Sequence, residues 1–120
     1  VDYGSARSLG DTFQAVRRHD KVSPLDAPGT ADLTAHVDFG ALAAAMPCAT
    51  TALTPQGVFL ERLGITERAR ALAARLSGAE LDSHVAAHRR LTHPEEMGSL
   101  FKTLGAFPEG AAPPPGLLDT

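Results

Sequence analysis

The stretch ADLTAHVDFGALAAAMP, residues 31–47, decides the class of fold. From residue 31 to 37, Ala, Leu, Ala and Val alternate with Asp, Thr and His, a pattern typical of a half-buried strand. Asp38 then fits the N-cap of a helix over residues 39–46, which Pro47 stops. A strand followed at once by a helix predicts a mixed α/β fold.

Further elements lie on both sides of this stretch. Outside 31–47 the patterns predict strands at Val1–Tyr3, Cys48–Leu53 and Leu100–Phe107, a short strand within 12–16 of an otherwise irregular segment 5–28, and four helices. The helices are expected to begin at Thr54-Pro55, at Thr66, and at the capping boxes Ser77 to Glu80 and Thr92 to Glu95, and to end near Gly64, Leu76, Leu91 and Gly98. This order favours an α/β sheet whose open edge needs partner strands.

Composition excludes several classes of partner. The net charge is −3 and the eleven Lys and Arg residues form no basic stripe, so nucleic acid is not expected to bind. No apolar run approaches the ~20 residues of a membrane span, and no signal peptide is evident. Cys48 is the only cysteine, which rules out an internal disulfide. With 5% aromatic residues, the core is expected to be thin.

The two ends of the chain differ in character. The sequence opens on Val1-Asp2-Tyr3-Gly4 without an initiator Met, as though the chain had been cut from a larger sheet. Residues 108–120 are rich in Pro, Gly and Ala, so we expect a frayed tail beyond a domain of residues 1–107.

Four blocks of sequence carry a resemblance to a known family. They are VDYG (1–4), PGTADLTAHVDF (28–39), QGVFLERLGI (56–65) and MGSLFK (97–102). In this order they resemble the carboxyl-terminal part of the MidA-like (DUF185) methyltransferases, a family that includes a protein arginine methyltransferase of mitochondrial complex I assembly.

The resemblance implies the carboxyl-terminal half of a Rossmann-like, S-adenosylmethionine-dependent class I fold with a helical insertion. Val1–Tyr3 would be its fifth strand, Cys48–Leu53 the sixth and Leu100–Phe107 the antiparallel seventh. The cofactor loop of such a fold lies before the fifth strand. No G-x-G-x-G occurs here between a strand and a helix, so no cofactor-binding residue is expected in this chain and the chain alone is expected to be inactive.

The resemblance also implies a protein arginine as substrate, whose guanidinium needs carboxylates to hold it. Asp2, Asp32 and Asp38 are the carboxylates nearest the family blocks, and Asp2 is expected at a strand's carboxyl end. Asp2 also suits a turn or a helix dipole, and Asp38 suits the N-cap. Tyr3 is a candidate for the pocket wall or for a half-buried structural ring. His36 is a candidate general base or a surface residue.

A metal site and an interaction module are the alternatives to the methyltransferase. His84 and His88 lie four apart on one helix and His93 follows, but without a Glu after the first His or a nearby Cys we reject a physiological metal site. The chain is alternatively a non-catalytic interaction module.

The basic residues of segment 5–28 suit either a solvated loop or an anion-binding or substrate-binding loop.

The expected setting follows from the same resemblance. The partner would be a protein substrate such as a subunit of respiratory complex I, and self-association into a homo-oligomer is compatible with an exposed sheet edge. High Ala and Arg content suits a bacterial cytoplasmic protein, and the mitochondrial matrix is the alternative.

Overall fold

A computed structural model describes residues 1–118 of the 120-residue chain. Its elements, in chain order, are β1 (Asp2–Ser5), β2 (Gln14–Arg17), β3 (Asp20–Val22), β4 (Asp32–Thr34), β5 (Val37–Asp38), α1 (Phe39–Ala45), β6 (Ala49–Thr50), β7 (Thr54–Pro55), α2 (Gln56–Arg62), α3 (Ile65–Ala73), α4 (Gly78–Thr92), α5 (Met97–Leu100), β8 (Phe101–Thr103) and β9 (Ala106–Phe107).

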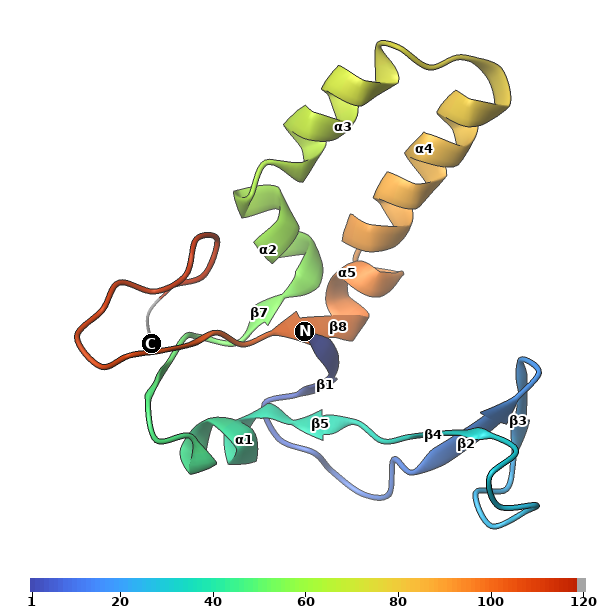
Figure 1. The fold of residues 1–120 in the computed structure, drawn as a ribbon, viewed down its shortest axis with the longest axis vertical. Coiled ribbons are helices and arrows are strands. Elements are labelled where there is room, and N and C mark those ends of the chain that lie inside the picture. Colours follow the sequence, from blue (N-terminus) through green and yellow to red (C-terminus); the bar gives the residue numbers. More distant parts are fainter. Residues whose placement is uncertain (119–120) are drawn as a thin grey trace.

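The main sheet has the order β5-β1-β8-β7 and contains β1 in its interior (Figure 1). Strand β1 runs parallel to β5, with Gly4 opposite Val37, and antiparallel to β8, with Tyr3 opposite Phe101. Strand β7 is also antiparallel to β8. Strands β1 and β7 therefore share one direction, and β8 runs the opposite way between them.

A second sheet of order β3-β2-β4 projects from the main sheet, and we call residues 14–34 the β-arm (Figure 1). The predicted strand within 12–16 is present as β2, but the sequence analysis missed β3. Arg18 and His19 make the β2–β3 turn with φ of 51° and 71°. Hairpin turns of this kind usually carry Asn or Gly, so the sequence held no turn signal there.

Helices α2 to α5 form a second projection, the helical arm of residues 56–100, in which α3 and α4 lie side by side (Figure 1). At the end of the helical arm nearest the main sheet, glycines in α2 and α5 let these helices approach the backbone of α4 closely. A Cβ at Gly57 or at Gly98 would overlap the carbonyl oxygen of Thr92. Gln56 is buried there, and its Nε2 donates to the carbonyl of Leu91 at 2.9 Å. Close backbone contacts at the two glycines and the hydrogen bond of Gln56 thus hold α2, α4 and α5 together.

Several predicted helix starts need correction. Helix α2 begins at Gln56, and the hydroxyl of Thr54 donates to the carbonyl of Ala52 instead of capping the helix. Helix α3 begins at Ile65 after Gly64, so Thr66 is not its cap. Ser77 does stand at the N-cap of α4, but its side chain makes no capping hydrogen bond. The short helix α5 begins at Met97, after the predicted start and beyond the Thr92 box.

Two predicted strands are shorter than expected. Within Cys48–Leu53 the paired residues are the two-residue strand β6 and an isolated bridge at Thr51, and β6 pairs with β9 outside the main sheet. The Leu100–Phe107 strand divides into β8 and β9 because Leu104 and Gly105 interrupt it. The N–H of Gly105 donates to the hydroxyl of Thr51 at 2.9 Å, and the N–H of Thr51 donates to the carbonyl of Gly105 at 3.0 Å. These bonds between distant parts of the chain replace the expected ladder.

The tail is ordered as far as residue 118, which corrects the expectation of fraying. Leu117 is buried, and the N–H of Ala52 donates to the carbonyl of Leu118 at 2.9 Å. The prediction of a frayed tail also covers residues 119 and 120, which are outside the described residues. The division of the chain at residue 107 stays a prediction.

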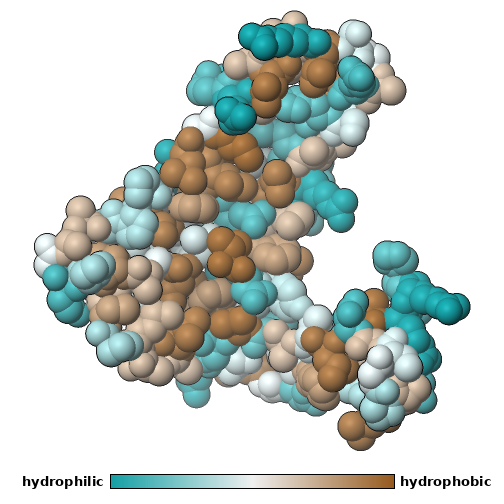
Figure 2. Space-filling view, viewed as in Figure 1, coloured by the Kyte–Doolittle hydropathy of each residue, from teal (hydrophilic) through white to brown (hydrophobic). Residues whose placement is uncertain are grey.

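Little of the apolar surface is covered. The buried apolar side chains are Ala15, Phe39, Phe107 and Leu117, whereas 13 large apolar side chains are exposed. The radius of gyration is 17.7 Å, against about 14 Å for a compact domain of this length. Figure 2 shows apolar surface over the region of the main sheet and α1, which we call the body, and along the helical arm. It also shows a hollow between the helical arm and the β-arm. Within residues 1–118 no helix is long and apolar enough to cross a membrane.

The close packing at Gly98 predicts a large effect of a small change. Gly98→Ala should lower the free energy of unfolding by about 1–3 kcal/mol, because the new methyl group overlaps the Thr92 carbonyl. Urea unfolding followed by circular dichroism measures this. Ser99→Ala, at the next and exposed position of α5, is the control and should change stability by less than about 0.5 kcal/mol. Equal stability of the two variants would contradict this packing.

Candidate functional site

Three aromatic rings from separate parts of the chain meet on one face of the main sheet. The centroid of the Tyr3 ring lies 5.7 Å from that of His36 and 5.5 Å from that of Phe101. Tyr3 belongs to β1, Phe101 to β8, and His36 immediately precedes β5. Tyr3 and Phe101 are directly opposite each other across the antiparallel pair, so their side chains point to the same face.

Asp2 does not join this group. Successive side chains of a strand point to opposite faces, so Asp2 is turned away from the Tyr3 ring. Its Oδ1 accepts a hydrogen bond from the N–H of Tyr3 at 2.8 Å. Asp2 is the first residue of β1, whose carboxyl end lies at Ser5, so the expected position at a strand's carboxyl end is corrected.

Asp38 is confirmed as the N-cap of α1. Its Oδ1 accepts from the N–H of Ala41 at 2.8 Å, and its Oδ2 accepts from the N–H of Ser8 at 2.9 Å. The hydrogen bond from Ala41, followed by the one from Ser8, holds the pKa of Asp38 below its ordinary value. Both carboxylate oxygens therefore accept backbone hydrogen bonds, and together they hold the segment that follows β1 against the start of α1.

Asp32 lies apart from the rings. It is the exposed first residue of β4, and its cross-strand neighbour is Val16 of the β-arm. The three carboxylates considered for the guanidinium thus lie in three different settings, and none of them belongs to the aromatic group.

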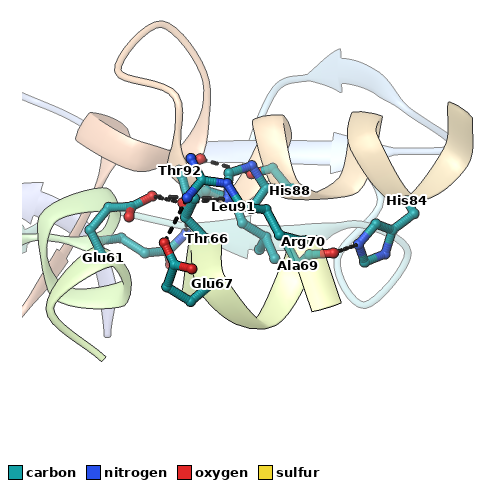
Figure 3. Close-up of polar contacts among 10 residues, drawn as sticks. Glu61, Thr66, Glu67, Ala69, Arg70, His84, His88, Leu91 and Thr92 are labelled. Carbon is teal, nitrogen blue, oxygen red and sulfur yellow. Dashed lines mark hydrogen bonds and ion pairs between the residues drawn. The ribbon is translucent and has the colours of Figure 1, made fainter. Parts of the chain in front are cut away.

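The histidines of the helical arm make specific structural contacts (Figure 3). The hydroxyl of Thr66 donates to Oε1 of Glu61 at 2.6 Å and lies 3.0 Å from Nε2 of His88. Because that hydroxyl hydrogen is given to Glu61, Nε2 of His88 is the donor in the second bond. Nε2 of His84 lies 2.9 Å from the carbonyl of Ala69 and is likewise the donor.

These bonds bear on the metal alternative. They join α2 and α3 to α4, beside a small groove of about 230 Å³. His93 accepts the N–H of Glu95 at its own Nδ1, at 3.2 Å. Across residues 1–118 there is no group of three or more His, Cys, Asp or Glu side chains placed to hold a metal ion. The histidines are therefore assigned to helix packing, and the rejection of a metal site stays a prediction.

A cavity of about 720 Å³ lies on the β-arm beside the β2–β3 turn. Arg17, at its wall, donates to Thr30 at 3.0 Å and pairs with Asp26 at 3.2 Å. These contacts fold the loop before β4 over the hairpin. In the part of the chain that the structure describes, Arg18 and Lys21 make no ion pair. The question of a solvated loop or an anion-binding loop stays open for this region.

Comparison with known proteins finds methyltransferases. Residues 1–58 match the model of a family described as S-adenosyl-L-methionine-dependent methyltransferases. The chain is 34% identical over 111 residues to the protein arginine methyltransferase NDUFAF7 of Xenopus laevis, a mitochondrial protein. The chain is thus similar to proteins of an S-adenosylmethionine-dependent methyltransferase family.

Two solved structures have a similar fold. A COG1565 superfamily protein of Burkholderia thailandensis superimposes with a TM-score of 0.68 and 30% identity, over 92% of this chain and 32% of that one. A second, bound to S-adenosyl-homocysteine, gives 0.69 and 28%, over 96% and 32%. The match to the Xenopus protein covers 90% of this chain and 25% of that protein. The chain thus spans about a quarter to a third of these relatives.

One member of the aromatic group was missed from the sequence. The MidA-like block at 97–102 contains Phe101, but nothing local indicates which residue of β8 faces Tyr3. Only the register of the β1–β8 pair decides that, and a two-residue pairing leaves no periodicity to read.

The hydrogen bonds of Asp38 predict a specific response to acid. The pKa of Asp38 is lower in the folded chain, so its contribution to stability is present above the ordinary Asp value of about 4 and is lost as the pH falls through the folded pKa. Asp38→Asn should therefore lose less stability than the parent chain between about pH 7 and about pH 3.

The measurement is the urea midpoint at each pH. Asp20→Asn is the matched control, because Asp20 is exposed and makes no side-chain hydrogen bond within residues 1–118. That variant should follow the parent chain. Parallel acid responses of Asp38→Asn and the parent would contradict the assigned role of this carboxylate.

Proposed function

We propose that this chain is the substrate-side part of an S-adenosylmethionine-dependent methyltransferase that modifies arginine in proteins. The observation that carries the proposal is the match along 90% of the chain to relatives named protein arginine methyltransferases, at 34% identity. The covered part of those relatives is about a quarter of their length, so the activity is assigned to a longer polypeptide that contains this chain.

The sheet supports a place in the carboxyl-terminal half of a Rossmann-like class I fold. We assign β1 as the fifth strand, β8 as the antiparallel seventh, and β7 as the sixth. The order β1-β8-β7, with β8 opposed to both neighbours, supports this assignment. The sixth strand is thereby moved from Cys48–Leu53 to Thr54–Pro55, because only the latter pairs with β8.

We assign the binding of the cofactor to a part of the protein outside this chain. Ligands of open α/β sheets bind beyond the carboxyl ends of parallel strands. Here the ends of β1 and β5 are filled by the chain's own backbone, because Gly40 donates to the carbonyl of Ala6 at 2.9 Å and Asp38 binds Ser8. A Cβ at Gly40 would overlap that carbonyl, so the two backbone segments are in direct contact there.

Tyr3 and His36 are the residues of this chain that we assign to the substrate cleft. They lie together on one face, His36 is exposed, and Tyr3 is half-buried. The ring of Tyr3 would form a wall of the cleft, and His36 would be placed to take a proton from the guanidinium nitrogen that is methylated. Asp2 points to the opposite face and leaves the candidate set.

The partner in this proposal is a protein that presents an arginine, and a subunit of respiratory complex I is the class that the family resemblance implies. The curated relatives are named as mitochondrial and the solved relatives are bacterial, which supports a mitochondrial matrix or a bacterial cytoplasmic setting. The exposed apolar side chains of the body and the helical arm would face the rest of the longer polypeptide. Burial of these side chains against the rest of the polypeptide would explain the same apolar surface that otherwise favours a non-catalytic interaction module.

A chimera tests the proposal. In the Burkholderia thailandensis protein that binds S-adenosyl-homocysteine, the matched segment is replaced by this chain. The chimera should bind S-adenosyl-homocysteine in a calorimetric titration and transfer a methyl group to an arginine peptide but not to its lysine counterpart. The isolated chain should do neither.

The unmodified Burkholderia protein is the control for folding and binding. Binding of S-adenosyl-homocysteine by the isolated chain would contradict the assignment of the cofactor to another part. A chimera that binds this ligand as the control does, but leaves the arginine peptide unmodified, would contradict the arginine assignment.

A further inference from the structure

We propose that Tyr3, His36 and Phe101 form an aromatic subsite for a guanidinium cation, which holds both the substrate arginine and its methylated product. This inference rests on the proposed function, and it adds Phe101 and a mode of recognition to it. Asp2, Asp32 and Asp38 lie outside the group, so recognition by these rings would depend on ring faces instead of ion pairs with those carboxylates.

The ring geometry supports this role. The His36 and Phe101 rings meet the Tyr3 ring at interplanar angles of 78° and 88°. Two rings at right angles do not stack on each other, so ring faces stay available to a third group. An aromatic face is electronegative and attracts a guanidinium within about 6 Å of its centroid. Perpendicular rings thus form a corner in which a planar cation contacts one face while its edge meets another ring.

The rings are held in place before any ligand binds. Tyr3 and Phe101 are both half-buried and face each other across the β1–β8 ladder. The backbone N–H of Tyr3 is further bonded to the Asp2 carboxylate. Side chains that are already ordered lose little entropy on binding, which favours a site with few contacts. His36 is exposed, so the group opens to solvent on that side.

The neighbouring charge does not compete with a ligand cation. Lys102 follows Phe101 on β8, and strand alternation turns it to the opposite face. There its Nζ donates to the carbonyl of Ser99. A methylated guanidinium keeps its charge and adds apolar contact with the rings, so the subsite should retain affinity for the product.

Tyrosine fluorescence gives a direct readout at this position. The chain has one tyrosine, Tyr3, and no tryptophan, so a change in intrinsic emission reports on this ring alone. The probes are N-acetyl-arginine amide, its Nω-methyl derivative, and N-acetyl-citrulline amide, a neutral molecule of the same shape. Both cations should change the Tyr3 emission in a saturable way, and citrulline should not.

Phe101 supplies the decisive variant. Phe101→Leu should weaken binding of both cations about two- to five-fold, as expected for the loss of one ring at an exposed site. Phe101→Tyr keeps a ring and should bind as the parent does, which is measured by calorimetric titration because this variant adds a second tyrosine. Phe13→Leu is the matched control, because Phe13 is a half-exposed aromatic residue that precedes the β-arm, and it should bind as the parent does.

The outcomes separate this subsite from the proposed function. An equal response to arginine and citrulline, or unchanged binding in Phe101→Leu, would overturn the aromatic subsite and leave the chimera test of methyl transfer untouched. Loss of binding in Phe101→Tyr as well as in Phe101→Leu would overturn it too, because a structural defect would then explain the result.

Discussion

The backbone pairing of β1 with both β5 and β8 is the constraint on which the rest of the structure depends. Four residues join a parallel neighbour that leads into α1 to an antiparallel neighbour that follows the helical arm. At Gly4 the β5 backbone lies so close that a Cβ would overlap the carbonyl of Val37. With few buried apolar side chains elsewhere, this ladder carries much of the specificity that a larger core would supply.

The same strand decides which chemistry the chain can present. Alternation along β1 places Tyr3 with Phe101 on one face, and Asp2 on the other. Parallel pairing with β5 brings His36 to the Tyr3 ring. The carboxylates that a guanidinium would ordinarily seek are therefore separated from the rings. The sheet face that carries Tyr3 is aromatic, and the proposed recognition of a guanidinium by rings follows from this separation of rings and carboxylates.

The Asp38 cap indicated helix α1 correctly, because a capping side chain bonds within its own turn. The single strand predicted over 31–37 was wrong, because β4 and β5 belong to different sheets and Leu33 is exposed. Other elements could not be predicted because distant contacts decide them. Strand β6 pairs with β9 because of Thr51 and Gly105, and Leu117 is buried by residues far along the chain. Phe101 was missed for the same reason, because register across β1 and β8 has no local signature.

Hydrogen exchange followed by mass spectrometry tests the central role of β1 most directly. If the β1 ladder holds the structure together, the segments 2–5, 37–38 and 101–103 should exchange slowly and open together. The β-arm turn at residues 18–19 should exchange earlier. Rapid exchange of residues 2–5 while residues 101–103 stay protected would contradict the account, because β8 would then be ordered without β1.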